Sequence, residues 1–337
     1  MSNLEQIVII KSHNDEKNIS RCIESVLSQG NFEEIKLFII DDASNDLTQK
    51  IIKSYKNYFY KMELRKVNLG ASNNVIDYNK IIKNYNNGYV VILSGDDYLP
   101  LNKLSFHKSI FLQYDVGLHF GNGYVKNTNN DVLYSYPTRN FAKGNSRLIN
   151  KNKNIFEDLI YENYIPSFAS AYSLKYLNKI NGFLCYPKNN LSVDFSTISR
   201  LSHVSKFYYS NQNLGFWVKS EGQQTELVRE EQILLDFKFI KFYINKLFTE
   251  KLITKKNFKS LNKKSIMFKN YTYFNNCKKY LSSGNFYSFL KYFFLVIFKK
   301  NTLDTKIKAF FLFFLFPFPN IVRKAYSLRS TFRLFKR

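Results

Sequence analysis

The chain has 337 residues and a formal net charge of +24. This length allows one large domain with an appendage and suffices to bury a sizeable hydrophobic core. The charge is uneven: residues 1–250 carry 30 Lys and Arg against 25 Asp and Glu, whereas residues 251–337 carry 20 against 1. We therefore expect the C-terminal segment to be drawn to an anionic surface, either lipid headgroups or nucleic acid.

Cysteine usage and the N-terminus exclude other classes of protein. Cys22, Cys185 and Cys277 are odd in number and far apart, which excludes a disulfide framework and a zinc-ligand spacing. The first residues lack a basic region followed by an apolar stretch, so we expect no signal peptide. The longest apolar run, 309–319, has roughly half of the ~20 residues that a spanning helix needs. These features predict a protein of a reducing cytosol.

The N-terminal third alternates between strand and helix patterns. Short apolar runs rich in β-branched residues predict buried parallel strands over 6–10, 37–40 and 89–93. Apolar residues at helical spacing predict helices over 16–29, 45–58 and 72–86. This alternation predicts an α/β sheet, whose ligands bind outside the carboxyl ends of the strands. Polar loops fall at that edge, over 11–16, 41–46 and 94–97.

Beyond residue 98 the pattern is weaker. We expect strands over 116–124 and 132–136, a helix over 190–201, and a helical series from 226 through 300. The absence of strand signals in that series places a boundary near residue 225. The predicted divisions are a nucleotide-binding half, an acceptor half and a helical region, over 1–98, 99–225 and 226–337.

A first carboxylate pair, Asp41-Asp42, ends the second predicted strand. Ser44 and Asp46 follow in the same turn, and either one suffices to cap the next helix. We therefore interpret the adjacent carboxylates as acceptors for ribose hydroxyls and for the N–H of a pyrimidine base. The alternative is that all four residues only cap the helix.

A second pair, Asp96-Asp97, follows the third predicted strand through Ser94 and Gly95. Gly95 permits a tight turn and a close approach of the backbone. A diphosphate beside two carboxylates would be repelled unless a divalent cation joined them, and Mg²⁺ and Mn²⁺ favour such oxygen sites. The alternative is a turn-forming Asp pair without a ligand.

The two pairs, in this order on consecutive strand ends, resemble the family 2 glycosyltransferases of the GT-A fold over residues 6–225. The motifs that carry the resemblance are Ile9-Ile10-Lys11-Ser12-His13-Asn14, Phe38-Ile39-Ile40-Asp41-Asp42-Ala43-Ser44-Asn45-Asp46, Asn68-Leu69-Gly70 and Leu93-Ser94-Gly95-Asp96-Asp97. The fold implied is a mixed central sheet flanked by helices, followed here by a helical extension. The activity implied is inverting transfer of a sugar from a nucleoside-diphosphate donor, with a UDP-sugar favoured.

The resemblance also implies residue roles. Asn181-Gly182-Phe183, Val193-Asp194-Phe195 and Arg200-Leu201 resemble a later family stretch, which makes Asp194 the general base. An inverting transfer needs one carboxylate to take the proton of the acceptor hydroxyl. Without the resemblance, Asp194 reads as a helix cap or a surface residue. The metal, Mn²⁺ or Mg²⁺, is expected on Asp97, and the donor on Ser12, His13, Asn14, Glu16, Asp41, Asp42, Ser44, Asn68, Gly70 and Asp96.

The chain departs from the family pattern at several positions. A proline, an Arg-Asn pair, an Asp, a Glu and a histidine are usual where this chain has Lys11, Val75-Ile76, Ser94, Val193 and Ser220. These departures remove a basic contact to the pyrophosphate and several candidate metal ligands. We therefore expect Asp97 to be the main protein ligand, with phosphate oxygens and water completing the shell. Glu221 is a further candidate ligand or a solvated charge.

The C-terminal segment combines aromatic residues at near-helical spacing with lysines. Phe286, Phe289, Phe293 and Ile297 recur along one helical pattern, beside cations such as Lys291. This composition is typical of an interfacial helix on anionic lipid. We expect residues 284–337 to contact the inner face of the cell membrane, where the acceptor would be a lipid-linked surface glycan. The alternative is helices that pack on the catalytic domain.

Two other functions remain open at this point. A sugar-nucleotide nucleotidyltransferase would use a similar sheet, but the Gly-rich basic stretch expected after its first strand is absent. A nucleic-acid-binding protein would use the basic tail but leaves the four aspartates unexplained, so we expect no nucleic acid. The isolated histidines share no ligand spacing, and we interpret His107, His119 and His203 as structural.

Overall fold

The computed structural model describes residues 4–30, 32–136, 145–150, 155–161, 163–219, 229–298 and 303–314. It divides into two compact units, Met1–Phe239 and Ile240–Arg337. The first unit thus continues past residue 225, where the sequence places a boundary, because it includes the first turns of helix α9 (Arg229–Thr249).

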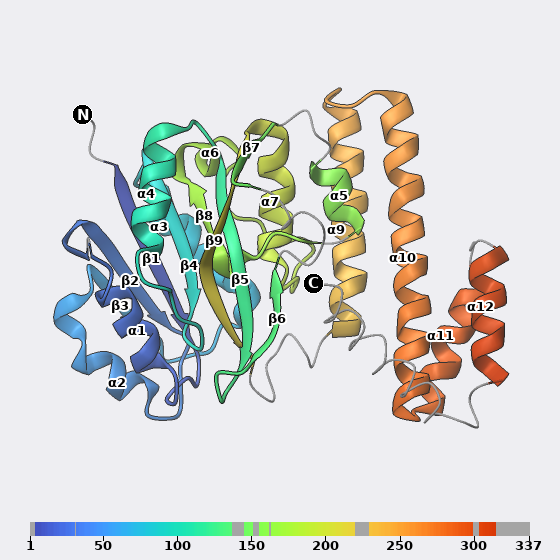
Figure 1. Cartoon of the computed structure of the whole chain (residues 1–337), viewed down its shortest axis with the longest axis horizontal. Helices are drawn as coiled ribbons and strands as arrows, with labels where there is room; N and C mark the ends of the chain where they lie inside the picture. Colours follow the sequence, from blue (N-terminus) through green and yellow to red (C-terminus); the bar gives the residue numbers. More distant parts are fainter. Residues whose placement is uncertain are drawn as a thin grey trace. The chain divides into compact units, whose positions relative to one another are not determined.

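Within the described residues, nine strands form one sheet at the centre of the first unit, with helices on both faces (Figure 1). The strand order is β3-β2-β1-β4-β8-β5-β9-β7, and β6 pairs with β5. β1, β2, β3 and β4 run parallel, whereas β8 is antiparallel to both of its neighbours. The prediction of a mixed α/β sheet is confirmed. The strands are β1 (Glu5–Ser12), β2 (Ile35–Asp41), β3 (Lys61–Leu64), β4 (Gly88–Ser94), β5 (Leu118–Asn127), β6 (Val132–Tyr136), β7 (Arg147–Ile149), β8 (Ser170–Ser173) and β9 (Phe207–Lys219).

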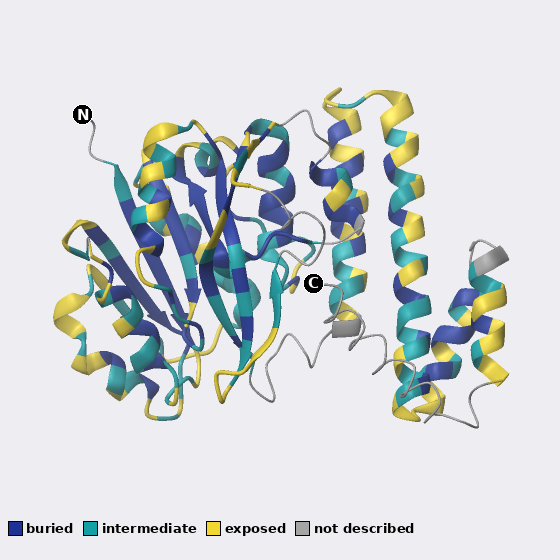
Figure 2. Cartoon of the chain, in the orientation of Figure 1, coloured by how far each residue is buried: buried dark blue, intermediate teal, exposed yellow. Residues whose placement is uncertain are grey.

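Side-chain alternation along the central strands builds a core on each face of the sheet. Val8 and Ile10 of β1 pack against the buried face of α1, which presents Cys22, Ile23 and Val26. β1 and β4 are buried along most of their length, as Figure 2 shows. The helices of this unit that precede α9 are α1 (Ile19–Leu27), α2 (Thr48–Ser54), α3 (Asn74–Ile82), α4 (Lys103–Gln113), α5 (Ile155–Tyr161), α6 (Leu174–Lys179) and α7 (Val193–Val204).

Strand register brings the polar loops together. Ser12 is paired with Asp41 across β1 and β2, and Lys11 is paired with Ser94 across β1 and β4. The three strands therefore end at the same edge of the sheet. The loops that follow them carry the candidate donor and metal residues, as expected for an open α/β sheet.

The second unit is helical throughout its described residues, as the sequence predicts. It contains the end of α9 and three further helices, α10 (Lys255–Ser283), α11 (Phe286–Phe298) and α12 (Leu303–Phe314). Phe289, Phe293 and Val296 of α11 are buried against residues of α10 and α12. Part of the predicted membrane-facing stripe therefore forms the core of this unit. No helix among the described residues is long and apolar enough to cross a membrane.

Candidate active site

Asp41 is fully buried at the end of β2. Each of its two carboxylate oxygens accepts two hydrogen bonds from other groups of the protein. Oδ1 accepts hydrogen bonds from the Ser44 amide at 3.0 Å and from Gln49 Nε2 at 2.7 Å. Oδ2 accepts from the hydroxyls of Ser12, at 3.3 Å, and Ser44. A carboxylate offers about four lone-pair sites. Asp41 therefore holds the shape of the 41–44 turn and joins it to the end of β1.

Asp42 is also buried, but it holds a different segment. Its Oδ1 accepts from the Leu69 amide at 3.0 Å and from Arg65 Nη1 at 2.9 Å, and its Oδ2 accepts from the Gly70 amide at 3.0 Å. Burial pushes the pKa of Asp42 upward, but the hydrogen bonds from the Leu69 amide and Arg65, and the charges of Lys11 and Arg65, outweigh it, so the pKa lies below its usual value. One acceptor position on Oδ2 remains for a ligand N–H or O–H. The Asn68-Leu69-Gly70 loop is thus tied to the end of β2.

Exposed side chains gather beside this loop. His13 Nδ1 lies 2.9 Å from the Asp42 carbonyl oxygen, and its Nε2 lies 3.1 Å from Asn68 Nδ2. Asn14 Oδ1 accepts from the Asn45 amide at 2.9 Å. The structure therefore brings His13, Asn14 and Asn68 together at the surface, above the buried aspartates. Their ring and amide edges are suited to stacking on a planar base and to hydrogen bonding with it.

Glu16 has a supporting position in the structure. Its Oε2 accepts from the Leu47 amide at 3.0 Å, while its own amide donates to Asp46 Oδ2 at 3.2 Å. Glu16 thereby fastens the loop after β1 to the loop after β2. It lies before α1, which begins at Ile19 instead of at Glu16 as the periodicity predicts.

Asp97 is buried beside two further carboxylates. Its Oδ1 accepts from the Val218 amide of β9 at 2.9 Å. Burial first, and then the negative charge of Asp96, raises the pKa of Asp97 well above its usual value. The same two causes raise the pKa of Asp15 to about 7. A Cβ at Gly95 would lie 2.4 Å from Asp15 Oδ2, so a larger residue here would force the Asp15 carboxylate to shift.

This donor set fits a divalent cation that shares its shell with a ligand. Mutual repulsion among Asp15, Asp96 and Asp97 would be relieved by a positive charge. The described residues contain no group of three or more His, Cys, Asp or Glu side chains placed to hold a metal. Mg²⁺ typically binds through one or two carboxylates plus substrate phosphates, and Asp97 with Asp96 matches that pattern. Ser220 and Glu221 lie outside the described residues.

Two cations act on the Asp96-Asp97 turn, Arg21 through a hydrogen bond and Lys103 through its charge. Arg21 of α1 donates to the Asp96 carbonyl oxygen at 3.3 Å and lies 4.7 Å from the centre of the Tyr98 ring. Lys103 is fully buried and donates to the Phe168 carbonyl oxygen at 2.7 Å. Burial lowers the pKa of Lys103 to about 7, against the opposing effect of Asp97. The sequence gives no signal for Lys103, because α4 has no clear apolar stripe.

The predicted Asn181-Gly182-Phe183 segment connects α3 with α7. Asn79 Oδ1 accepts from the Phe183 amide at 2.8 Å, and Asn79 Nδ2 donates to the Phe183 carbonyl oxygen at 2.9 Å. Gly182 has a φ of 77°, a conformation that favours glycine. Arg200 of α7 donates to the Gly182 carbonyl oxygen at 3.0 Å. These bonds fix α7 relative to the sheet.

Asp194 lies in the first turn of α7, partly buried. Asn163 Nδ2 lies 3.5 Å from its Oδ2. Burial raises the pKa of Asp194, although hydrogen bonds from the Phe195 amide and from its own amide oppose the shift. A carboxylate with a raised pKa is a stronger proton acceptor than an ordinary aspartate. The raised pKa is a property expected of a general base.

A second carboxylate lies beside the start of α7. Asp236 of α9 accepts from Gln232 Nε2 at 3.0 Å and from the Ser192 hydroxyl at 3.3 Å. Burial raises the pKa of Asp236 to about 6, and the charge of Asp194 adds to the shift. Gln232 Oε1 also accepts from the Leu191 amide at 2.9 Å. The sequence gives no signal for this carboxylate, because Asp236 lies in a segment predicted to belong to the C-terminal helical region.

Two further histidines lie in the core of the first unit. His107 and His119 are fully buried, with their Nδ1 atoms 2.8 Å apart, and His119 Nε2 lies 2.8 Å from the Ser210 hydroxyl. Burial lowers the pKa of His119 to about 3, so the ring stays neutral. The pair is a structural element of the core.

The chain is similar to known proteins in both sequence and fold. The model of the family described as glycosyl transferase family 2 matches residues 7–178. A 128-residue stretch is 29% identical to the Escherichia coli protein named UDP-Glc:alpha-D-GlcNAc-diphosphoundecaprenol beta-1,3-glucosyltransferase WfgD, covering 37% of this chain and 48% of that protein. A 122-residue stretch is 30% identical to an uncharacterized glycosyltransferase, the MG025 homolog of Mycoplasma pneumoniae, covering 35% and 37%. The chain thus matches less than half the length of these relatives.

Solved structures share the fold at low sequence identity. The S. aureus TarS 1-349 complex with UDP-GlcNAc is 14% identical, with a TM-score of 0.61, covering 95% of this chain and 88% of that one. The Pyrobaculum calidifontis mannosyltransferase PcManGT, in complex with GDP-Man and Mn²⁺, is 13% identical, with a TM-score of 0.52, covering 97% and 84%. These likenesses show the fold, and the family match over half of the chain shows that the chain belongs to glycosyl transferase family 2.

Proposed function

We propose that this glycosyltransferase moves a sugar from a UDP-sugar to a hydroxyl of a lipid-linked surface glycan, with inversion at the anomeric carbon. The observation that carries the proposal is the buried Asp42 carboxylate, which accepts from the Leu69 and Gly70 amides and retains one acceptor position. It lies beneath the exposed His13 and Asn14 side chains at the carboxyl edge of the sheet. Such an edge is where open α/β sheets bind nucleotides.

Donor binding is assigned to the half formed by residues 1–98. Asp42 would accept the base N–H or a ribose hydroxyl, and His13 would stack on the base or hydrogen-bond with it. Asp41, whose acceptor sites are filled by protein donors, would position the turn instead of contacting the ligand. A UDP-sugar is favoured because the names of the E. coli relative and of the S. aureus neighbour both specify a UDP-linked sugar.

Asp97, with Asp96 beside it, would hold Mn²⁺ or Mg²⁺ together with the donor diphosphate. The cation, when bound, would neutralise charge that develops on the departing nucleoside diphosphate. Support comes from the carboxylate cluster and from the Mn²⁺ named with the Pyrobaculum neighbour. The Val218 amide, through its bond to Asp97, would keep this carboxylate in one orientation.

Asp194 would act as the general base from the acceptor half, residues 99–225. Its raised pKa suits removal of a proton from the acceptor hydroxyl as that oxygen attacks the anomeric carbon. Inversion follows when the base and the leaving group lie on opposite faces of the sugar. The β-linkage in the name of the E. coli relative supports this stereochemistry by analogy.

Membrane contact through residues 284–337 would place the enzyme at the inner face of the cell membrane, beside a lipid-linked acceptor. Large aromatic side chains of α11 and α12 are exposed, among them Phe298 at 77% and Phe311 at 67%. Lys291, Lys306 and Lys308 lie on the same helices. Exposed aromatics beside cations suit insertion at an anionic lipid interface.

A nucleotide-sugar screen tests the proposal. Thermal melting of the full chain would be recorded with UDP-, GDP-, CMP- and dTDP-linked sugars, each with and without Mn²⁺. A ligand that binds the folded state raises its melting temperature. We expect the largest rise with one UDP-sugar in the presence of Mn²⁺, and the same rise to be absent in Asp42→Asn. Equal and negligible shifts with all donors would refute donor binding at this site.

A further inference from the structure

Arg65 lies directly after β3, and its guanidinium reaches carboxylates on three different elements. Nη1 donates to Asp42 Oδ1 at 2.9 Å, Nη2 donates to Asp77 Oδ2 of α3, and Nε donates to Glu63 Oε1 at 3.3 Å. The side chains of Arg65, Asp42 and Asp77 are all at least nine-tenths buried. The buried, planar guanidinium therefore joins the end of β2 to α3. We call the Asp42–Arg65–Asp77 arrangement the fork.

The fork restricts rotation of the Asp42 carboxylate, on which the proposed donor site depends. Asp42 Oδ1 is shared between Arg65 and the Leu69 amide, while Oδ2 holds the Gly70 amide. With Nη1 on Oδ1, rotation of the carboxylate would break at least one of these bonds. The orientation of Asp42 therefore fixes both the 68–70 loop and the direction in which the remaining lone pair of Oδ2 points.

The second buried cation of the cluster does not perform this task. Lys11 Nζ lies 3.7 Å from Asp77 Oδ2 and has no hydrogen-bond partner. Burial first, and then repulsion by Arg65, lowers the pKa of Lys11. The charge of Lys11 lowers the pKa of Asp42, but the hydrogen bonds that orient the Asp42 carboxylate come from Arg65 and from the Leu69 and Gly70 amides. Arg65 is thus the cation that connects α3 to Asp42.

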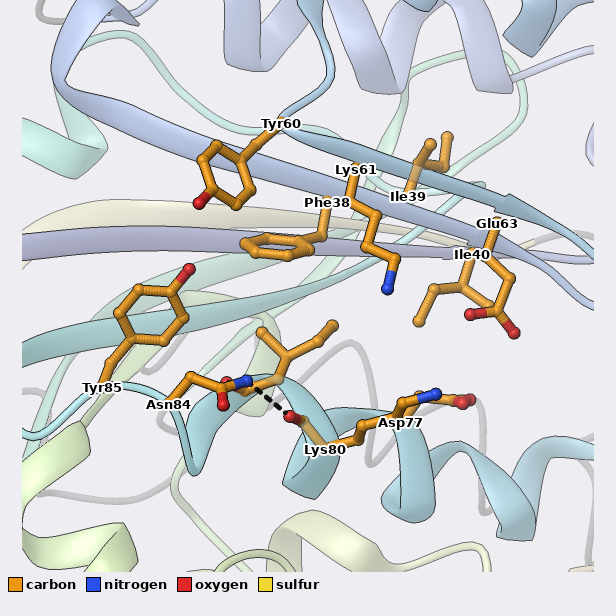
Figure 3. A pocket seen from close by; sticks show the side chains of 11 residues that line it. Phe38, Ile39, Ile40, Tyr60, Lys61, Glu63, Asp77, Lys80, Asn84 and Tyr85 are labelled. Atoms are coloured by element: carbon orange, nitrogen blue, oxygen red, sulfur yellow. Dashed lines mark hydrogen bonds between the residues drawn. The ribbon is translucent and has the colours of Figure 1, made fainter.

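Glu63 and Asp77, the two other carboxylates that hold Arg65, differ in how strongly their ion pairs stabilise it. Glu63 and Asp77 both line a groove of about 300 Å³ between β2, β3 and α3, and Figure 3 shows them at one end, away from Tyr60 and Tyr85. The Glu63 side chain is 40% exposed, whereas that of Asp77 is 10% exposed. Exposed ion pairs contribute little, so Asp77 is the main anchor of Arg65.

We propose that Arg65, held by Asp77, is a positioning residue that orients Asp42 for binding of the nucleoside diphosphate. This rests on the proposed function, in which Asp42 contacts the donor. Lysine cannot replace arginine here, because a single ammonium cannot donate along fixed parallel directions to two carboxylates on different elements.

The test titrates UDP with Mn²⁺ calorimetrically into the full chain. Arg65→Lys keeps the buried charge, and we expect it to raise the Kd for UDP about tenfold, as for loss of a charged hydrogen bond. At saturating donor, kcat should stay within about threefold of wild type, because Arg65 does not touch the reacting atoms. Hydrogen exchange of the segment 66–73 should become faster, since the Asp42 bonds to its amides loosen.

Two further variants separate positioning from folding. Arg65→Met removes the guanidinium from two buried carboxylates, Asp42 and Asp77, and is expected to be unstable. Arg65→Met combined with Asp77→Asn removes the charge left on α3, so its melting temperature should recover while the Kd for UDP stays raised. Lys36→Met is the control, because Lys36 pairs with Glu5 at 2.6 Å at the opposite end of the sheet. Its Kd should equal that of wild type.

Wild-type affinity in Arg65→Lys, or in the Arg65→Met, Asp77→Asn double variant, would overturn the positioning role and leave the proposed function standing. A wild-type chain that binds no nucleoside diphosphate would overturn the proposed function and, with it, the role of Arg65. A raised Kd together with an unchanged kcat supports both.

Discussion

Asn79 and Phe183 exchange two hydrogen bonds across 104 positions of the chain, at 2.9 and 2.8 Å. Asn79 lies in α3, which follows the donor loop, and Phe183 lies in the turn that Arg200 of α7 holds. The pair therefore links the donor half of the first unit to the helix that carries Asp194.

Asn79→Leu should destabilise the first unit. The substitution keeps the size of the side chain but leaves the Phe183 amide and carbonyl without partners, which costs about 2–4 kcal/mol for two groups. Urea unfolding followed by tryptophan fluorescence measures this loss. Asn84→Ala is the control, because Asn84 donates only to nearby carbonyl oxygens of its own helix. Equal stability of the two variants would contradict the linking role.

Asp194→Asn should lower kcat about 10²- to 10⁴-fold, the range for loss of a general base. The wild-type kcat should rise with pH through an acidic limb, and the raised pKa places this limb above that of an ordinary aspartate. The Asp194→Asn variant should lack this acidic limb.

Because the folded state disfavours the ionised form of Asp194, the Asp194→Asn variant should not have a lower melting temperature than wild type at pH 7. Asp115→Asn is the control, since Asp115 is exposed and pairs with Lys175. A variant with near-normal kcat would rule out Asp194 as the base.

Asp236 predicts a pH-dependent stability. Burial raises its pKa from 3.8 to about 6, so between about pH 4 and 6 the folded state binds more protons than the unfolded state. The contribution of this group to stability therefore falls as pH rises through that window and stays constant above it. Asp236→Asn should flatten the curve by about 2–3 kcal/mol, measured by urea unfolding at stepped pH. An unchanged slope would mean that the Asp236 carboxyl is not buried in solution.

Asp97→Asn should abolish Mn²⁺-dependent transfer, with a loss of at least about 10²-fold in kcat/KM. The amide oxygen of Asn can still accept from the Val218 amide, so the fold should persist. Asp131→Asn, at an exposed turn, controls for the loss of one negative charge. Transfer by the wild type that survives chelation of all divalent cations would show that Asp97 has another role.

Phe298→Ser combined with Phe311→Ser should weaken sedimentation with vesicles of phosphatidylglycerol and phosphatidylcholine. Removal of two exposed aromatic side chains from the lipid interface costs at least tenfold in partitioning, since full burial of one is worth about 1.5–3 kcal/mol. Phe106→Ser, an exposed position of α4, is the matched control. RNA binding with a steep salt dependence and no vesicle binding would favour the nucleic-acid alternative.

The fold is predictable where the pattern is strong. β1, β2 and β4 are runs of apolar β-branched residues and match the predicted strands closely. β8 consists of Ser, Ala, Tyr and Ser, whose short polar composition gives no strand signal, and its burial comes from its place between β4 and β5. β9 contains polar residues in its middle, around Asn211 to Asn213, at an irregular register with β5. Tertiary pairing, and not local propensity, forms these strands.

The site residues, like the strands, are predictable only where the local sequence carries a clear pattern. Asp41, Asp42, Asp96 and Asp97 stand out because acidic pairs at strand ends are visible in the sequence. Arg65 and Asp236 have no such signal, because their roles arise from partners far along the chain. The different tasks of Asp41 and Asp42 also depend on which side chains reach each carboxylate, and only the folded arrangement reveals this.

Product analysis of a single transfer reaction tests the central claim most directly. The full chain, an α-linked UDP-sugar, Mn²⁺ and a lipid-linked glycan acceptor would be incubated, and the nucleotide released and the new linkage identified by NMR. We expect release of UDP and a β-linked sugar on the acceptor, and we expect neither product with Asp194→Asn. Release of pyrophosphate, or an α-linked product, would contradict the central claim.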